Sequence, residues 1–460
     1  MSGIFGAFST TGTPVLEEVY LGLYALQHRG QEAAGIAWPD NGRISSSRGQ
    51  GLLHDALSQQ KLAEISAHSA IAHVSCSPLD LSQPQNILPL SANYARGLIA
   101  ISHDGCITNL SDLTKELEER GSIFHSETDS EAILHLIAQE AQMQPIEALV
   151  SSLKKLKGSS ALLVLLENEL VAFRDPWGFK PLCLGQKENT YYLASESCAL
   201  DIVGAKLIRD INPGEIVIIN KNGIKSLDIL TPNNTKRRMK CSFEYVYTAR
   251  PDSVIDGRSV YKARKEMGRR LAIKAPCPEA DIAAGMPDSG TISAIGYSEE
   301  SKTPFELAVV RNRYVGRTFI QPTQKVRELG VKIKLNPISD VFKNKKAVII
   351  DDSIVRGTTA QSIISMIRNS GATEVHLRVS SPPVIFPCKY SVDSRKEKTL
   401  AAVKMSLEEL CKKINADSLG YLTEEDLVES IGIPKDQLCT ACFTGEYLQE
   451  DITNKERDNE

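Results

Sequence analysis

Two adjacent carboxylates, Asp351 and Asp352, follow an apolar run at residues 347–350 and precede the turn Arg-Gly-Thr-Thr at residues 356–359. The run predicts a buried parallel strand, and the residues after the turn have the pattern of a helix. This order places backbone N–H groups and two hydroxyls at a helix N-terminus, where phosphate can bind. The carboxylates could accept hydrogen bonds from a sugar diol and help to hold Mg²⁺. The stretch therefore predicts a site for a phosphorylated sugar. The alternative is an ordinary turn with surface aspartates.

The composition is that of a globular protein with 460 residues, of which 42% are apolar and 24% charged, with a net charge of −4. This length is enough for two or three domains, and nothing in the charge pattern suggests nucleic-acid or membrane binding. The first residues lack a basic stretch before the apolar one, and no run approaches the length of a membrane span. We therefore expect a cytoplasmic protein, in which the ten cysteines suit metal binding better than disulfides.

The pattern of the chain changes along its length. The first half alternates short β-type runs with polar turns and has helical patterns near 15–27 and 128–142. A polar and basic linker follows, and then a strand–helix–strand pattern that is typical of a doubly wound parallel sheet. A mixed, mostly helical segment and a charged tail, expected to be frayed, complete the chain. The expected divisions are 2–230, 231–240, 241–395, 396–448 and 449–460.

Long segments of the chain resemble the glutamine phosphoribosylpyrophosphate amidotransferases, the first committed enzymes of purine synthesis. The similarity runs from Gly3 to about Leu448. The segments that carry it are LQHRGQEAAGIA (26–37), RDPWGFKPL (174–182), ASESCALD (194–201), FEYVYTARPDS (243–253), RNRYVGRTFIQPTQ (311–324), DDSIVRGTT (351–359) and CTACFTGEY (439–447).

The resemblance implies a fold and a reaction. The family joins a four-layer α/β/β/α glutaminase domain of the N-terminal-nucleophile type to a type I phosphoribosyltransferase domain with a doubly wound parallel sheet. Ammonia released in the first domain attacks the sugar C1 in the second. The products are phosphoribosylamine and pyrophosphate.

The resemblance also implies roles in the transferase half. In the loop at 285–298, backbone N–H groups are expected to bind the pyrophosphate, and Ser289 is expected to join Asp351 and Asp352 around Mg²⁺. Gly285 stands where the family commonly has proline, which could loosen the loop without removing the site. The expected substrate-binding residues are Asp288, Ser289, Gly290, Arg311, Arg317, Lys334, Asp351, Asp352, Ser353, Arg356, Gly357, Thr358 and Thr359.

The segment 311–338 resembles the flexible lid that closes over the substrate in this family. Arg311, Arg313, Arg317 and Lys334 give it a cationic face. Its closure would exclude water and protect an oxocarbenium-like centre from hydrolysis. The alternative is that these cations are solvated surface charges.

Four cysteines, Cys241, Cys388, Cys439 and Cys442, stand where part of the family carries a [4Fe–4S] cluster. Four thiolates suit such a cluster or a zinc ion, and a third alternative is that no metal binds. A cluster here would link the C-terminal helices to the transferase domain. The other cysteines are expected to be core or surface thiols, namely Cys76, Cys106, Cys183, Cys198, Cys277 and Cys411.

The glutaminase half departs from the family at its nucleophile. The family uses a cysteine that becomes the mature N-terminus, with its α-amine as the base, whereas this chain has Ser2. The small side chain of Ser2 still permits removal of Met1. A serine hydroxyl is a far poorer nucleophile than a thiolate near neutral pH, although N-terminal Ser and Thr nucleophiles exist.

Two further changes affect the same expected pocket. Ser75 replaces an arginine that helps to bind the glutamine α-carboxylate. Asp104, before Gly105, replaces an asparagine that donates to the oxyanion, and losing one such donor costs roughly 100- to 1,000-fold in rate. Asp129 and the segment 28–30 match the family. We therefore expect Ser2, Asp104, Gly105 and Asp129 to be remnants of a glutaminase site without useful activity.

Three functions follow from this comparison. In the first, the transferase is active and takes ammonia that is free or supplied by a glutaminase-competent partner, such as a paralogous subunit in a mixed oligomer. In the second, the protein is an ordinary amidotransferase that uses Ser2. In the third, it is a regulatory or binding subunit that senses phosphoribosylpyrophosphate or purine nucleotides. The intact diphosphate loop, lid and Asp351–Asp352 pair favour the first over the third.

Overall fold

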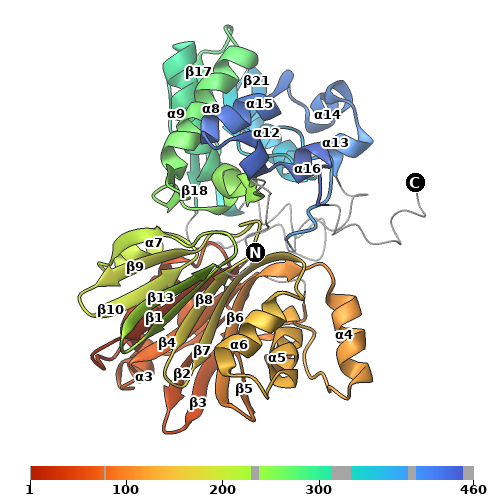
Figure 1. Cartoon of the computed structure of the whole chain (residues 1–460). Helices are drawn as coiled ribbons and strands as arrows, with labels where there is room; N and C mark the ends of the chain where they lie inside the picture. The colour runs from red at the N-terminus through yellow and green to blue at the C-terminus, as the bar shows by residue number, and fades with distance from the viewer. Residues whose placement is uncertain are drawn as a thin grey trace.

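The structure is a computed structural model that describes residues 2–76, 79–228, 238–312, 314, 333–391 and 400–448. Figure 1 shows two halves, one that ends with β13 (Gly223–Asp228) and one that begins with β14 (Lys240–Cys241). The N-terminus lies at the boundary between them (Figure 1). In the described ranges, no helix combines the length and the apolar composition that crossing a membrane requires.

The first half contains two antiparallel sheets. Within the described residues, one has seven strands in the order β11-β9-β10-β1-β4-β2-β3, and the other has six in the order β13-β12-β8-β7-β6-β5. The strands are β1 (Ser2–Ser9), β2 (Ala33–Asp40), β3 (Arg43–Gln50), β4 (Ser69–Ser75), β5 (Leu90–Tyr94), β6 (Gly97–Ile107), β7 (Gly158–Leu166), β8 (Leu170–Arg174), β9 (Cys183–Lys187), β10 (Thr190–Ala194), β11 (Lys206–Asp210), β12 (Glu215–Asn220) and β13.

Helices cover the outer faces of the two sheets. The helices of this half are α1 (Leu16–Ala25), α2 (Leu53–Ala56), α3 (Gln59–Ala63), α4 (Leu110–Glu119), α5 (Asp129–Gln139), α6 (Pro145–Leu153) and α7 (Cys198–Ile202). Because side chains alternate along β1, Ile4 packs against Leu163 between the sheets, whereas Phe5 packs with Leu23 of α1. On the other sheet, Leu162 packs with Ile133 of α5. The expected four-layer α/β/β/α arrangement is thus confirmed.

The second half is built on a parallel sheet. Its described part pairs four strands in the order β17 (Ile282–Gly285), β20 (Lys346–Asp351), β21 (Glu374–Val379) and β22 (Ser418–Tyr421). The remaining elements are β15 (Val254–Ile255), β16 (Arg258–Ser259), α8 (Val260–Lys274), α9 (Ser289–Ser301), β18 (Val309–Arg311), β19 (Leu335–Pro337), α11 (Ser339–Phe342), α12 (Thr358–Asn369), α13 (Ala401–Lys404), α14 (Leu407–Ile414), α15 (Glu424–Ile431), β23 (Leu438–Cys439) and α16 (Ala441–Thr444).

Helices cover both faces of this sheet, which explains the unbroken apolar run in β20. Val348 and Ile350 face a cluster that includes α8, α9 and α15, and Ala347 and Ile349 face one that includes α12 and α14. The expected doubly wound parallel sheet is therefore confirmed. The segment 396–448 does more than pack on it, because β22 pairs with β21 as a further parallel strand.

Next to the junction of the two halves, a short parallel ladder within the second half places Cys241 of β14 opposite Cys439 of β23. The Met239 amide donates to the Trp177 carbonyl at 2.8 Å, and the Cys241 amide to the Phe179 carbonyl at 3.3 Å. Most of the expected linker, residues 231–237, and the expected tail lie outside the described residues. The last residue of that linker belongs to β14.

Candidate functional site

The carboxyl ends of two parallel strands bring the predicted phosphosugar residues together. In the β17–β20 pair, Gly285 lies opposite Ile350, so the loop before α9 and the loop before α12 leave the same edge of the sheet. The first loop carries Asp288 and Ser289, and the second carries Asp351 and Asp352. Side chains that are more than 60 positions apart therefore meet.

Ser289 and the acidic pair are in direct contact. The Ser289 hydroxyl donates to one oxygen of Asp352 at 2.5 Å, and the Ser353 hydroxyl donates to the other at 2.6 Å. The amide of Asp352 donates to the Asp351 carboxylate at 3.0 Å. Among the described residues, neither carboxylate forms an ion pair. Within the part of the chain that the structure describes, these two neighbouring acids thus have no ion-paired cation.

The pKa values of this pair reflect that lack of compensation. Burial and the nearby charge of Asp352 hold the pKa of Asp351 well above its usual value. Burial also raises the pKa of Asp352, although hydrogen bonds from Ser289 and Ser353 and the charge of Arg264 oppose the shift. Two like charges that share a dry site favour a cation, and carboxylate oxygens are ligands that Mg²⁺ accepts.

The two loops depend on close backbone packing. A Cβ on Gly290 would lie 2.4 Å from the Ile350 carbonyl oxygen, so α9 can approach β20 only without a side chain there. A Cβ on Gly285 would lie 2.5 Å from Thr291 Cα, so this glycine also packs tightly. The Gly290 amide donates to the Met286 carbonyl at 2.9 Å.

The turn before α12 has the form of an anion-binding helix start. Gly357 adopts φ 78° as the residue before the helix, a conformation that favours glycine. Thr358 and Thr359 form the first turn, and Arg356 is exposed beside it. The amide groups of such a first turn point out of the helix end and suit a phosphate.

The ends of the expected lid are paired with each other. Val309–Arg311 (β18) pairs antiparallel with Leu335–Pro337 (β19), and the Asn312 amide donates to the Lys334 carbonyl at 2.7 Å. Arg311 forms an ion pair with Asp288 of the loop that is expected to bind the diphosphate. Two of the predicted lid residues, Arg313 and Arg317, lie outside the described residues.

The expected glutaminase pocket is occupied by a network of charges. The Ser2 backbone nitrogen donates to Asp104 Oδ1 at 3.2 Å. Asp104 also lies 3.7 Å from the Lys180 ammonium and 3.2 Å from the Arg29 guanidinium. Burial would raise the pKa of Asp104, but Lys180 and Arg29 outweigh it and lower the pKa to about 2.

Arg29 connects this pocket to the transferase half. Its side chain is fully buried, and its two terminal nitrogens each donate at 2.9 Å to one oxygen of Glu244. It also donates to Glu196 at 2.7 Å and to the Ser2 carbonyl at 2.8 Å. Glu244 belongs to a helical turn, Glu244–Thr248, that follows β14. The bidentate pair is therefore a bond between the two halves.

The other predicted pocket residues adjoin this network, since Ser75 lies opposite Ser2 in the β1–β4 pair. The Ser75 hydroxyl lies 3.0 Å from His73 Nδ1, and His103 Nδ1 lies 3.1 Å from Asp129 Oδ1. A Cβ on Gly105 would lie 2.1 Å from the Ser159 carbonyl oxygen, so this position requires glycine. Ser75 is buried and offers a short hydroxyl where a guanidinium would carry charge.

The four predicted metal ligands gather at the junction of the halves. Cys241 and Cys439 face each other in the β14–β23 ladder, and α16 carries Cys442. The Cys442 carbonyl accepts from the amides of residues 385 and 386, close to Cys388. Burial, followed by the charges of the other three thiols, holds the pKa of Cys442 well above its usual value. Four thiols gathered in one place, one of them buried and three partly buried, match the donor set of a metal centre.

Sequence reasoning missed the residues that neutralise Asp104 and join the halves, namely Lys180, Glu196 and Glu244. All three lie inside segments that carry the family resemblance, RDPWGFKPL, ASESCALD and FEYVYTARPDS. The available signal was a charged residue within a largely apolar stretch, which predicts a buried and therefore paired charge.

Comparisons with known proteins agree over nearly the whole chain. A family model described as a glutamine amidotransferase domain matches residues 79–201. The amidophosphoribosyltransferase of Methanocaldococcus jannaschii is 44% identical, with 98% of each chain covered. The enzyme of that name from Bacillus subtilis is 42% identical over 97% of this chain and 94% of its own length.

Solved structures give the same answer. Glutamine phosphoribosylpyrophosphate amidotransferase from B. subtilis, in complex with ADP and GMP, matches with a TM-score of 0.90 and 40% identity, covering 98% of each chain. A structure described as the allosteric regulatory enzyme of purine biosynthesis matches with a TM-score of 0.89 and 40% identity, covering 98% of this chain and 97% of the other. The chain therefore belongs to the amidophosphoribosyltransferase family, the phosphoribosylpyrophosphate-dependent glycosyltransferases of purine synthesis.

Proposed function

We propose that this chain forms phosphoribosylamine from phosphoribosylpyrophosphate with ammonia that it does not itself release from glutamine. One observation carries the proposal. The acidic pair Asp351–Asp352 has no ion-pair partner among the described residues, whereas Asp104 of the front pocket is neutralised by Lys180 and Arg29. The first arrangement suits a metal-bound substrate, and the second suits a permanent structural contact.

The substrate pose follows from the two loops. The 5-phosphate would bind at the first turn of α12, near Thr358 and Thr359, and the ribose diol would donate to Asp351 and Asp352. The diphosphate would lie at the start of α9, where Ser289 and the acidic pair would hold Mg²⁺. When bound, this ion would neutralise the developing charge on the leaving pyrophosphate. Attack of ammonia at C1 would then break the bond to pyrophosphate.

The front pocket offers three arguments against glutamine hydrolysis. A base must be free of its proton, but a carboxylate 3.2 Å from the Ser2 nitrogen would stabilise the protonated α-amine of a processed chain. Asp104 places negative charge where an oxyanion would form, and its carboxylate offers no N–H donor to stabilise that oxyanion. Ser75 cannot form the bidentate contact that an arginine makes with a carboxylate.

One assay tests this proposal directly. Purified full-length protein is incubated with phosphoribosylpyrophosphate and Mg²⁺, and pyrophosphate release is followed with ammonium chloride or with glutamine. We expect turnover with ammonium chloride and none above background with glutamine. Equal turnover with both would support hydrolysis by Ser2, and no turnover with either would support a binding or regulatory subunit. Either result would contradict the proposal.

The source of ammonia can be examined by restoring the pocket or by adding a partner. The triple variant Ser2→Cys, Ser75→Arg and Asp104→Asn would return the family residues to all three positions. Some recovery of glutamine hydrolysis is expected, since Asp129 still matches the family. We also propose that the chain works in an oligomer with a glutaminase-competent paralogue. Glutamine-dependent turnover at the transferase site of this chain in the copurified mixed assembly, and none by this chain alone, would support that part of the proposal.

We also propose that purine nucleotides bind to this chain, because the B. subtilis relative was solved with ADP and GMP. Nucleotide binding would be tested by the change in melting temperature that ADP and GMP produce. No shift at millimolar concentration would contradict it.

We propose a [4Fe–4S] cluster on Cys241, Cys388, Cys439 and Cys442. Four thiolates are the donor set of such a cluster. The rings of Phe179 and Tyr390, stacked with their centroids 3.9 Å apart, pack in the same apolar cluster as Cys388 and Cys439.

Cys439→Ser tests the cluster. The substitution should remove most of the iron and the visible absorption of anaerobically purified protein and lower its melting temperature. Cys411→Ser, at a half-buried thiol on α14, is the matched control and should keep both signals. Full iron content in Cys439→Ser would contradict the assignment, and zinc in its place would support a single-ion site.

A further inference from the structure

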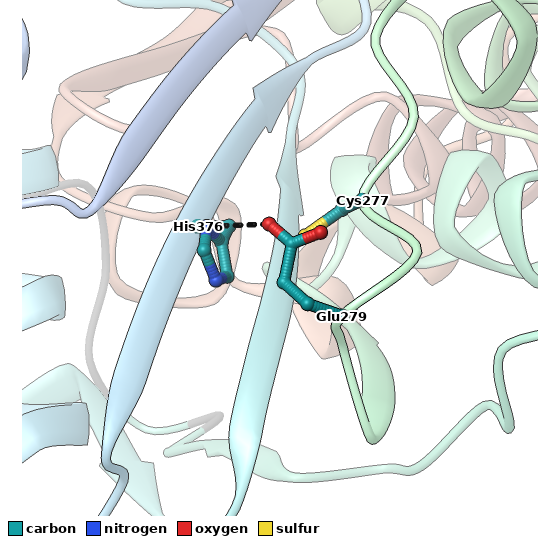
Figure 2. A group of neighbouring side chains, drawn as sticks. All are labelled: Cys277, Glu279 and His376. Carbon is teal, nitrogen blue, oxygen red and sulfur yellow. Dashed lines mark ion pairs between the residues drawn. The ribbon is translucent and has the colours of Figure 1, made fainter.

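A second group of metal-binding side chains lies at the amino ends of the parallel strands, at the opposite edge of the sheet from Asp351. The Cys277 sulfur, a Glu279 carboxylate oxygen and a His376 ring nitrogen all lie within 4.8 Å of one another. Figure 2 shows His376 on a strand, facing Cys277 and Glu279 on a neighbouring loop. The strand is β21, and the loop joins α8 to β17. This position separates the group from the phosphosugar site and from the four junction cysteines.

The three donor types together suit a borderline-soft divalent ion. Zinc accepts thiolate, imidazole and carboxylate ligands, whereas Mg²⁺ and Ca²⁺ prefer oxygen alone. Glu279 Oε1 and His376 Nδ1 are 3.7 Å apart, the spacing of two atoms that share one small ion.

His376 is held as a metal-binding histidine usually is. Its Nε2 lies 3.2 Å from Glu374 Oε2, and the other Glu374 oxygen lies 2.7 Å from the Lys346 ammonium. Metal-ligating imidazoles commonly donate their second N–H to a carboxylate, which fixes the ring and the tautomer. Donation from Nε2 to Glu374 would leave the Nδ1 lone pair facing Glu279 and the Ser418 hydroxyl, which is 2.9 Å away.

The loop that carries Cys277 is also fixed. Arg378 donates to the Ala275 carbonyl at 2.7 Å and to the Pro276 carbonyl at 3.0 Å, immediately before the cysteine. Burial raises the pKa of Cys277 to about 12, against the opposing charge of Arg378. The thiol is therefore protonated near neutral pH, so an ion that binds here must displace a proton.

Exposure provides an entry path. The Glu279 side chain is 41% exposed, whereas that of His376 is 4% exposed and Cys277 is 1% exposed. Two buried ligands with one at the surface allow a hydrated ion to reach the group and keep one water. We propose that Cys277, Glu279 and His376 bind a divalent transition metal of the zinc type, with water as the fourth ligand. The ion would tie the α8–β17 loop to β21 as a structural clip.

Cobalt titration of the full-length protein, after dialysis against a chelator, tests this site. Wild type should bind one more Co²⁺ per chain than Cys277→Ala, with a sulfur-to-cobalt band in the near ultraviolet that the variant lacks. Cys411→Ala is the matched control and should retain the band, and the junction cysteines contribute equally to all three proteins. Glu374→Gln should weaken binding about 10- to 100-fold, as such supporting contacts do. Binding should tighten as pH rises, because the thiol loses a proton.

Equal stoichiometry and equal spectra for wild type and Cys277→Ala would overturn the proposal. If Cys277→Ala does not fold, Glu279→Gln decides the question, because this exposed side chain can change without a core rearrangement. Cobalt affinity at least about 10-fold weaker in Glu279→Gln supports the site, and unchanged affinity in both Glu279→Gln and Glu374→Gln overturns it.

Discussion

The front pocket around Asp104 and the back pocket around Asp351 and Asp352 both contain buried carboxylates, but the pKa values of these carboxylates shift in opposite directions. Asp104 is surrounded by Lys180 and Arg29, and its pKa falls to about 2. Asp351 lies beside Asp352, and its pKa rises well above the usual value. Asp104 thus has ion-pair partners, whereas Asp351 and Asp352 have none among the described residues. Carboxylates that bind a cation with its ligand are left without cationic side chains beside them, whereas carboxylates with a structural role are paired with such side chains.

The largest effect on turnover is expected from removing the two negative charges of the back pocket. Asp351→Asn with Asp352→Asn should lower ammonia-dependent pyrophosphate release about 1,000-fold or more, because the metal and diol contacts contribute several kcal/mol. Turnover is measured at saturating ammonium chloride. The Mg²⁺-dependent rise in melting temperature should also disappear.

Asp340→Asn, at an exposed position in α11, is the control and should behave like wild type. Without Mg²⁺, the double variant should melt no lower than wild type, because two repelling acids have been removed. Normal turnover in the double variant would show that Asp351 and Asp352 do not take part in the reaction, and the contrast between the two pockets would then have no functional meaning.

A smaller effect is expected where the front network reaches the transferase half. Glu244→Gln removes the charge that Arg29 contacts at 2.9 Å through two nitrogens, and breaking a buried pair of this kind costs about 3 kcal/mol of unfolding free energy. The matched change Asp252→Asn breaks an ion pair with Arg250 whose Asp252 side chain is 52% exposed, and should cost less than about 1 kcal/mol.

Denaturant midpoints, followed by the fluorescence of Trp177 at the junction, measure both losses. Ammonia-dependent turnover per folded molecule should be unchanged in Glu244→Gln. A large loss of turnover with normal stability would show that the front network serves the reaction instead of the fold.

The smallest expected effect is that of Asp104→Asn. Because Lys180 and Arg29 depress its pKa from 3.8 to about 2, Asp104 contributes stability above its unfolded pKa. That contribution is about 2 kcal/mol at pH 7 and is lost as pH falls from about 4 to about 2. The wild-type and variant unfolding curves should therefore differ at pH 7 and converge near pH 2. A difference that does not change with pH would mean that Asp104 acts by packing alone.

The back pocket could be predicted from local pattern, and the front network could not. The apolar run before Asp351 and the glycine turn after it are adjacent in sequence, so strand, turn and helix are all visible there. Glu244 and Lys180 acquire their roles only when distant segments meet at Arg29 and Asp104. No periodicity marks such partners.

Two features of the second half, the strand β22 and the position of Cys277, depend on residues that are distant in the sequence. The strand β22 has four residues, including a glycine, and forms because β21 offers a parallel partner. Cys277 is buried, as a core thiol should be, but its closeness to His376 could not be predicted because the two residues lie on separate elements. Local propensity says little about either feature, since tertiary pairing determines both.

The ladder between β14 and β23 affects the order in which the chain folds during its synthesis. Its two strands pair Lys240 with Leu438 and Cys241 with Cys439, and the apolar cluster at the junction joins Phe179 of the first half to Cys439 and Leu448. The junction is therefore complete only after residues 438–448 have left the ribosome. N-terminal domains generally fold first during synthesis. The front half can therefore complete its sheets first, and the contacts of Phe179 with the C-terminal residues form later, after residues 438–448 have been translated. A premature stop before residue 438 would give a truncated protein in which the apolar surface around Phe179 is exposed to cellular proteases.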